Sequence, residues 1–344
     1  MAISRVTLAA TSFSGSNLYY ASGLKPAQQQ ILLAGLQSAG VKVLRVWLDG
    51  VSGTVKGTPV DTVPSLEGDS PGGYDDTVLN HLDDFMAVAN GYGIKLLVSL
   101  YSYNALAANS DFYGKYYGTG DFYTNSDAIN YYKQRVAHIM AHVNPHNGKP
   151  WSQSSEYIFA FETQNEAMHD QASWQCNIAG AIRSNLAGNT NILVSTGGGA
   201  WLANSLLDAY FSCDALDVLA IHAYGVGDFA TSTIQPYVSK AQAAGKKLIM
   251  QEWGACYTTA ENNNCNGGGP LDEGTRGSNI KQWAGSIAAA GVPQFYWQIL
   301  PNEDPHQDWD YEVGVGGVNW DDLKGASLDA SQADAAFDFG PWLL

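Results

Sequence analysis

Residues 75–100 read DDTVLNHLDDFMAVANGYGIKLLVSL, and this stretch shows the unit from which the chain is built. A helix-like segment runs as far as Gly93, and a short apolar segment, 94–100, follows it at once. A glycine at the end of a helix suits the left-handed C-cap that closes many helices. The stretch therefore predicts a helix that passes through a tight turn into a strand.

The same unit recurs along the chain. Further helix-like segments that lead into apolar strands are 28–40, 127–143 and 171–186. The sequence offers eight strand candidates, which are 12–20, 43–48, 94–100, 157–162, 191–196, 216–222, 247–252 and 293–299. Alternating strands and helices predict a parallel sheet. Because no Gly-x-Gly-x-x-Gly motif follows the first strand, we expect an α/β fold of the (β/α)8 TIM-barrel type, with residues 1–344 as a single domain.

Four long connections are expected at the mouth of this barrel, at about residues 51–74, 101–125, 255–275 and 301–320. The C-terminal face of such a barrel carries the active site, and the loops after the strands build it. Long loops at that face are usually functional or mobile. The loop 301–320 also contains Trp309, a candidate platform for a sugar ring.

The composition argues against some classes of partner. The chain has 33 Asp plus Glu and 17 Lys plus Arg, and its formal net charge is -16. Such a surface repels phosphate groups and anionic lipids, so we expect neither nucleic acid nor a membrane as partner. No apolar run approaches the roughly 20 residues that a membrane span needs. Aromatic residues reach 12%, with 10 Trp and 19 Tyr, and their apolar faces and polar edges suit sugar rings.

The four cysteines point to the compartment. Cys256 and Cys265 flank an Asn-rich stretch and predict a disulfide that closes a loop, which leaves Cys176 and Cys213 for a second bridge. Buried free thiols are the alternative. An even number of cysteines without a metal-binding pattern favours an oxidising compartment, so we expect a secreted, extracellular protein, with a monomer as the default. The first residues show no signal peptide, so we expect this chain to be the mature form.

Two glutamates stand out at the ends of the strand candidates. Glu166 follows the fourth strand and Glu252 ends the seventh, so a barrel places them on opposite sides of its mouth. Two carboxylates about 5–5.5 Å apart are typical of retaining glycosidases. We expect Glu252 to attack the anomeric carbon and Glu166 to act first as acid and then as base. Burial and the neighbouring negative charge would raise the pKa of the acid and keep it protonated.

The ends of the second, fourth and sixth strands supply residues that suit the nucleophile and the sugar. We expect Arg45 to pair with Glu252 and keep it ionised, and Tyr224 to donate a hydrogen bond to the same carboxylate. Asn165 would bind the sugar 2-hydroxyl, a contact that strengthens in the transition state. The alternative for Arg45 is a structural ion pair, and Glu162, in the fourth strand, is more consistent with a carboxylate paired in the core than with direct catalysis.

The sixth and eighth strands add an imidazole and an indole. His222 would hydrogen-bond near the acid/base, and Trp297 would form the floor beneath the reacting sugar. Taken alone, each of these residues is more often part of a protein core. The specificity of the pattern lies in the ordered set.

That ordered set resembles glycoside hydrolase family 5, which belongs to a clan of retaining (β/α)8 hydrolases. The residues that carry the resemblance are Arg45, Asn165, Glu166, His222, Tyr224, Glu252 and Trp297. The resemblance extends over about 13–297 and implies the catalytic roles described for the two glutamates. Within the family, the segments 121–125, 132–136 and 154–160 are similar to endo-β-1,4-mannanases, which implies a β-1,4-linked mannan as the polysaccharide or oligosaccharide substrate.

The chain departs from the mannanase pattern at three places. Strand three ends in 100–104 where mannanases show an Asn-Asn-Trp-like ending, Ala167 replaces a proline, and Trp253 replaces a phenylalanine after the nucleophile. Because the first change alters a wall that contacts sugar, a β-glucan or a β-galactan, with endo or exo action, stays open. The residues expected to bind substrate are Arg45, Trp47, Tyr103, Asn165, His222, Tyr224, Trp253, Trp297 and Trp309.

Other classes of function have less support in the sequence. It contains neither the His-Glu-x-x-His motif of many metallohydrolases nor the Gly-x-Ser-x-Gly motif of serine hydrolases. The acidic stretch 301–309 invites calcium but lacks the spacing of an EF-hand loop. We therefore expect no metal and no cofactor. A transglycosidase and a barrel that binds sugar without turnover are alternatives, and replacing Glu252 with Gln would separate an enzyme from the latter.

Overall fold

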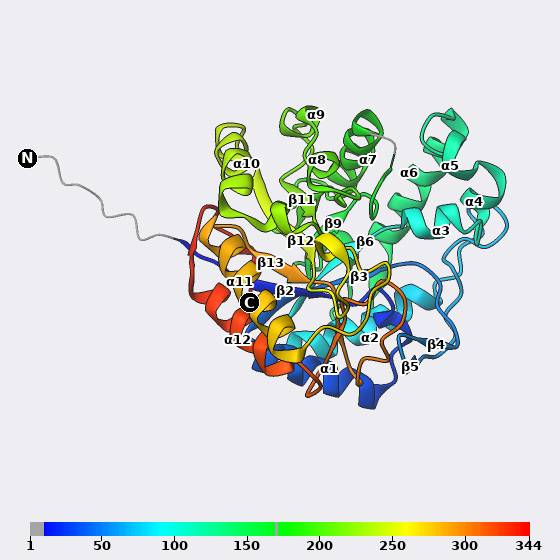
Figure 1. The fold of residues 1–344 in the computed structure, drawn as a ribbon. Coiled ribbons are helices and arrows are strands. Elements are labelled where there is room, and N and C mark those ends of the chain that lie inside the picture. Colours follow the sequence, from blue (N-terminus) through cyan, green and yellow to red (C-terminus); the bar gives the residue numbers. More distant parts are fainter. Residues whose placement is uncertain (1–9, 169–170) are drawn as a thin grey trace, which may run out of the picture.

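The computed structural model describes residues 10–168 and 171–344. Eight parallel strands form a closed barrel in sequence order, and the last strand pairs with the first (Figure 1). The strands are β2 (Ser14–Asn17), β3 (Val41–Trp47), β6 (Lys95–Ser99), β9 (Ile158–Glu162), β10 (Leu193–Ser195), β11 (Val218–His222), β12 (Lys247–Trp253) and β13 (Gln294–Tyr296). This arrangement confirms the predicted (β/α)8 barrel.

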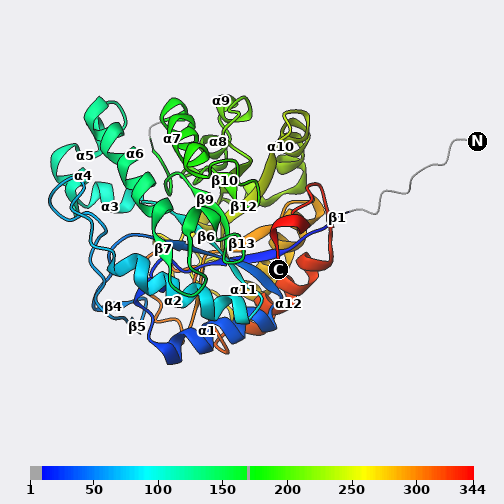
Figure 2. The ribbon, with the colours of Figure 1, turned by 180° about the vertical axis from the view of Figure 1, so that it is seen from behind.

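Helices surround the strands in both views of the ribbon (Figures 1 and 2). The longer ones are α1 (Pro26–Ser38), α2 (Thr77–Gly91), α6 (Ser126–Ala141), α7 (Ala172–Asn185), α10 (Thr231–Ala243), α11 (Glu273–Ala289) and α12 (Trp320–Gln332). Between β10 and β11 the connection holds only the short helices α8 (Leu202–Ser205) and α9 (Asp208–Phe211). The predicted glycine caps are confirmed, because Gly40 and Gly93 have φ values of 71° and 75°.

The first and the eighth predicted strands end differently in the structure. The first candidate, 12–20, contributes only β2 to the barrel, because the chain turns into a 3-10 helix at Ala21–Gly23. The eighth candidate, 293–299, divides into β13 and β14 (Ile299–Leu300), and β14 leaves the barrel to pair with β15 (Val313–Gly314). This division turns the chain after β13 across the barrel mouth.

Phenylalanines close the N-terminal end of the barrel. Phe13, just before β2, packs edge-on against Phe159, Phe295 and Phe339, with ring centroids 5.7, 5.8 and 5.3 Å apart. All four side chains are buried. Because this end is filled with aromatic rings, a substrate can approach the barrel interior only from the opposite, C-terminal end.

The mouth loops carry small elements of their own. The loop 51–74 contains the hairpin of β4 (Thr54–Val55) and β5 (Thr58–Pro59), and the loop 101–125 folds into α3 (Tyr103–Ala107), α4 (Phe112–Tyr116) and α5 (Gly118–Asp121). Two further antiparallel pairs lie outside the barrel, namely β1 (Ala10–Thr11) with β16 (Asp334–Ala335), and β7 (Val143–Asn144) with β8 (Lys149–Pro150).

Both predicted disulfides are present. Cys256 is bonded to Cys265 and Cys176 to Cys213, which rules out the alternative of buried free thiols. The first bridge closes the loop 255–275, and the second ties α7 to the end of the connection before β11. Among the described helices, none is both long and apolar enough to cross a bilayer.

Candidate active site

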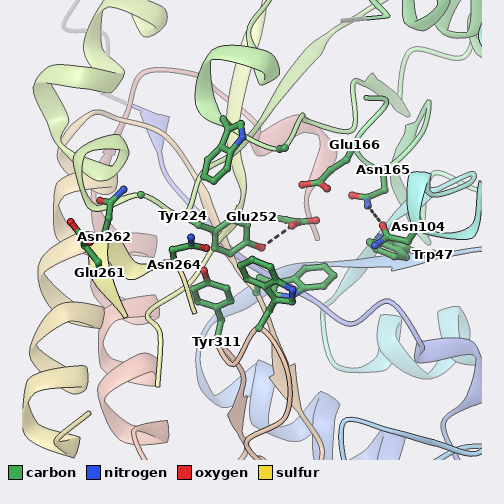
Figure 3. A pocket seen from close by; sticks show the side chains of 15 residues that line it. Trp47, Asn104, Asn165, Glu166, Tyr224, Glu252, Glu261, Asn262, Asn264 and Tyr311 are labelled. Carbon is green, nitrogen blue, oxygen red and sulfur yellow. Dashed lines mark hydrogen bonds between the residues drawn. The ribbon is translucent and has the colours of Figure 1, made fainter. Parts of the chain in front are cut away.

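Two carboxylates meet at the C-terminal end of the barrel, and both point into one cavity (Figure 3). Glu252 lies in β12, whereas Glu166 lies beyond the end of β9. A carboxylate oxygen of each, together with a ring nitrogen of His222, falls within 4.8 Å of the others. The side chain of Glu166 is 19% exposed and that of Glu252 is 5% exposed.

The backbone around Glu166 is fixed from both sides. The N–H of Asn165 donates to the carbonyl of Tyr101 at 2.8 Å, and the N–H of Glu166 donates to the carbonyl of Gly197 at 2.9 Å. These bonds hold Glu166 at a φ of 49°, in the left-handed region that side chains rarely adopt. A Cβ at Gly197 would lie 1.7 Å from the carbonyl oxygen of Gln164, so only glycine allows this close approach.

Arg45 forms the base of the site. From β3 its Nη1 donates to Glu252 at 2.5 Å, while Nε and Nη2 donate to Glu162 at 2.6 and 2.8 Å. All three side chains are at least nine-tenths buried. Burial lowers the pKa of Arg45, but the two carboxylates outweigh it and the net shift is upward, so the guanidinium stays charged. The expected pair of Arg45 with Glu252 and the core pairing of Glu162 are both confirmed.

Glu252 receives a second donor from the sixth strand end. The hydroxyl of Tyr224 donates to its Oε2 at 2.8 Å, as expected from the sequence (Figure 3). Burial raises the pKa of Glu252, and the charges of His222 and Arg45 oppose that rise. Each oxygen of the carboxylate thus has a donor, and these bonds favour its ionised form.

His222 connects the two glutamates. Its Nδ1 lies 3.0 Å from Glu166 Oε1 and 3.5 Å from Glu252 Oε2, and its Nε2 lies 2.8 Å from Gln251 Oε1. Burial lowers the pKa of His222, but the charge of Glu252 and the hydrogen bond and charge of Glu166 shift it upward overall. The imidazole therefore favours the protonated form, which donates to Glu166.

Aromatic rings line the cavity above these groups. The cavity has a volume of about 600 Å³. Trp297 lines it, stacked on Tyr19 with a centroid distance of 5.9 Å and tilted against Trp47 at 5.7 Å. Trp201 and Trp309 lie on its walls and are 52% and 54% exposed. The apolar faces of these aromatic rings are of the kind on which sugar rings stack.

A smaller cavity of about 350 Å³ adjoins the first. Ala200 and Trp201 line both, and Tyr103 lines the smaller one. The predicted sugar contact Tyr103 therefore lines the smaller cavity and not the main one. A chain of sugar units that occupies the main cavity has room to continue past Trp201.

The family model described as Cellulase (glycosyl hydrolase family 5) matches residues 6–303. The chain belongs to glycosyl hydrolase family 5. Two curated relatives, mannan endo-1,4-beta-mannosidases 5 and 2 of Solanum lycopersicum, are each 29% identical over 182 residues. This match covers 49% of the chain and only 41% of the relatives' own length.

Solved structures give the same fold for other members of family 5. The endo-1,4-beta-D-mannanase of Thermotoga petrophila RKU-1 superposes with a TM-score of 0.68 at 19% identity, covering 93% of this chain and 99% of that one. The family 5 mannosidase of Rhizomucor miehei gives a TM-score of 0.70 at 15% identity, with 94% of each chain covered. At such identities the likeness supports the barrel fold.

Three of the predicted substrate contacts need correction. Trp253 is 1% exposed and packs edge-on against Tyr296 at 5.0 Å. Its neighbour Glu252 points into the barrel mouth, and successive side chains of a strand point to opposite sides, so Trp253 points toward the helices. Arg45 and His222 are fully buried beneath the glutamates and do not line the cavity. They contact the carboxylates of the glutamates, and their side chains do not reach the cavity surface.

Tyr103 lines the smaller cavity, and the remaining predicted contacts line the main one, namely Trp47, Asn165, Tyr224, Trp297 and Trp309. Sequence reasoning missed further lining residues, which are Asn104, Trp201, Glu261, Asn262, Asn264 and Tyr311. Trp201 follows three glycines after the fifth strand, and an aromatic residue at that place was a usable signal. The asparagines of the loop 255–275 had no comparable signal.

Proposed function

We propose that this family 5 chain hydrolyses a β-linked polysaccharide with retention of configuration, with Glu252 as nucleophile and Glu166 as acid/base. The observation that carries the proposal is the short separation of the two carboxylates, within 4.8 Å. Retaining enzymes hold their carboxyl groups about 5–5.5 Å apart, whereas inverting enzymes need about 6.5–9.5 Å to admit a water molecule.

In the first step, Glu252 attacks the anomeric carbon while Glu166 gives its proton to the glycosidic oxygen. Arg45 and Tyr224 hold both oxygens of Glu252, so the attacking carboxylate is oriented before substrate binds. Asn165 accepts from Arg45 at 2.7 Å and donates to Asn104 at 3.1 Å. Its amide has a second N–H, which is available for the sugar 2-hydroxyl.

In the second step, Glu166 takes a proton from water, and the water oxygen attacks the glycosyl ester of Glu252. The ester carries no negative charge, so the carboxylate of Glu166 no longer faces a second carboxylate. Protonated His222, 3.0 Å from Glu166, stabilises the carboxylate that results. The imidazole therefore supports the carboxylate form of Glu166, which is the form that acts as base.

We further propose a β-1,4-linked mannan as substrate, cleaved within the chain. The support is the similarity to two curated mannan endo-1,4-beta-mannosidases and the extension of the main cavity past Trp201. Room on the far side of Trp201 favours internal cleavage over removal of terminal units. The two disulfides support action outside the cell.

The first test is the stereochemistry and identity of the products. We would digest mannopentaose and follow the new anomeric proton by NMR within the first minutes. A β-anomer that later mutarotates is the expected result, and a first-formed α-anomer would refute the retaining mechanism. In parallel, galactomannan, glucomannan, β-1,3-glucan, β-1,6-galactan and carboxymethyl-cellulose are incubated and the products separated. A ladder of manno-oligosaccharides supports endo-mannanase action, and release from another polymer alone contradicts it.

A further inference from the structure

A second cluster of ionisable side chains lies outside the catalytic site, in the loop that follows the last barrel strands. It consists of Asp304, His306 and Asp310, and we call it the loop cluster. One potential ligand atom of each residue lies within 4.8 Å of the other two. The hydrolysis described above uses none of these side chains.

Distances within the loop cluster suit one shared metal ion. His306 Nδ1 lies 3.2 Å from Asp304 Oδ2 and 3.1 Å from Asp310 Oδ2. In a tetrahedral site with metal–ligand bonds of about 2.1 Å, the ligand atoms lie about 3.4 Å from one another. The side chains would therefore have to separate by only a few tenths of an ångström to enclose such an ion.

Two buried oxygens of the loop cluster lack a hydrogen-bond donor. Asp310 is 5% exposed, and its Oδ1 has no donor among the described residues. Asp304 Oδ2 has none either, because the nearby His306 nitrogen is not aligned for a hydrogen bond. Buried carboxylate oxygens without donors are costly, and two neighbouring carboxylates repel each other. A cation or a shared proton must therefore compensate them.

The basic side chains nearby are already engaged with other groups. Lys56 forms an ion pair with Glu312 at 3.0 Å. Arg276 donates Nε to the carbonyl of Ala255 at 3.0 Å and Nη2 to the carbonyl of Glu312 at 2.9 Å. Within residues 10–168 and 171–344, neither lysine nor arginine forms an ion pair with the loop cluster. A compensating metal cation would therefore have to come from solution.

The donor set selects the kind of ion. One imidazole nitrogen with two carboxylates suits Zn²⁺, whereas Ca²⁺ prefers six to eight oxygen ligands. We propose that Asp304, His306 and Asp310 bind a Zn²⁺-type divalent transition-metal ion. The side chain of His306 is 35% exposed, so the ion can enter from solvent and a water molecule can complete its coordination. The proposal is independent of the substrate and of the catalytic roles.

Such an ion would fasten one wall of the cavity. Trp309 and Tyr311, on either side of Asp310, line the cavity. The carbonyl of Asp310 accepts from the N–H of Tyr257 at 2.9 Å, which links the loop cluster to the disulfide-closed loop 255–275. Metal binding is therefore expected to raise the thermal stability of the whole chain.

The test is calorimetric titration of the whole chain with ZnCl2 after chelator treatment, together with Tm measurements. We expect a one-to-one site, a higher Tm with Zn²⁺, and little response to Mg²⁺ or Ca²⁺. Replacing His306 with Gln or Asp310 with Asn should weaken binding by about 100-fold or more, because each removes a ligand. The control Asp308→Asn removes the same charge from an exposed residue of the loop and should change the affinity less than about twofold. Titration with Co²⁺ adds a visible absorption band that reports tetrahedral coordination.

Three results would overturn the proposal. If His306→Gln and Asp310→Asn both bind Zn²⁺ with wild-type affinity, the ion binds at another site. If binding disappears only in Glu166→Gln, the ion binds at the other group that can hold a metal, which is Glu166, His222 and Glu252. Absence of binding to the wild-type chain leaves a shared proton as the explanation, since burial and a hydrogen bond to Asp304 raise the pKa of Asp310 to about 8. His306 lies at the surface, so His306→Gln is expected to fold even where Asp310→Asn does not.

Discussion

The floor and the rim of the cavity are built in opposite ways. The floor is the charged layer at the strand ends beneath the cavity, of which only Glu252 lines the cavity itself. It consists of Arg45, Glu162, His222 and Glu252, all at least nine-tenths buried and joined by ion pairs. The rim consists of loop residues, among them Trp201 and Trp309, whose rings are about half exposed. The floor thus has one arrangement, whereas the rim can vary without disturbing the barrel.

This difference separates chemistry from specificity. Buried, paired charges fix the geometry in which a bond is broken, and their cost is covered only when every partner is present. Exposed rings on loops contribute stacking area to whichever sugar unit reaches them. Changes in the floor should therefore affect turnover or stability, and changes in the rim should affect binding of longer substrates.

The largest effect is expected for the proposed nucleophile. Glu252→Gln keeps the volume but removes the attacking carboxylate, so kcat on mannopentaose should fall by at least about 10⁴-fold. The matched control is Glu261→Gln, which makes the same change on the rim and should alter kcat less than about threefold. Retention of more than a few per cent of wild-type turnover by Glu252→Gln would exclude it as the nucleophile.

A large loss of stability is expected at the base of the floor. Arg45→Met leaves Glu162 and Glu252 buried without their shared cation, which should lower the free energy of unfolding by about 3–5 kcal/mol. Arg183→Met removes a pair with Asp217 whose side chains are each 31% exposed, and it should cost about 1 kcal/mol or less. Urea denaturation of both variants measures the contrast, and equal losses would show that burial does not distinguish the two pairs.

A moderate effect on binding is expected at the rim. Trp309→Ala removes an exposed platform, so KM for manno-oligosaccharides should rise by about tenfold with kcat nearly unchanged. Trp253→Phe alters a buried ring and should lower the Tm while leaving KM unchanged. Steady-state kinetics on substrates of increasing length test this pair. A drop in kcat for Trp309→Ala without a change in KM would place this ring with the floor.

The smallest effect is a pH dependence of stability through His222. The pKa of His222 is raised in the folded state, so the fold binds this proton more tightly than the unfolded chain does. Its stabilising contribution is therefore complete below the unfolded pKa, about 6.5, and is lost as the pH rises through the folded pKa. Urea midpoints of wild type and His222→Gln should differ most at acidic pH and converge at alkaline pH.

A histidine without a carboxylate partner serves as the control for that measurement. His81 bonds the carbonyl of Ser22 at 2.8 Å, so His81→Gln removes an imidazole without removing a charge pair. We expect its difference from the wild type to vary less with pH than that of His222→Gln. A gap between wild type and His222→Gln that widens as the pH rises would contradict the assigned direction.

Sequence patterns predicted the parts of this protein that depend on local periodicity. Helix, glycine and strand recur along the chain, and such local signals were enough to predict the barrel. Once the barrel is assumed, residues at strand ends meet at one face, so Glu166, Tyr224 and Glu252 could be placed together. The alternation of side chains along β12 also predicts that Glu252 and Trp253 point apart, and Trp253 was misplaced because this rule was not applied to it.

Only the tertiary structure decided which side chains the loops bring together and how deeply each of them is buried. Trp201 reaches the cavity because the segment after β10 turns inward, and no local pattern encodes that direction. Arg45 and His222 act through the carboxylates because they lie beneath them, and depth cannot be read from residue type. The loop cluster forms because an irregular loop folds back on itself, so the spacing of Asp304, His306 and Asp310 matches no motif. Local periodicity is set by bonds along the chain, whereas these contacts are set by the packing of distant segments.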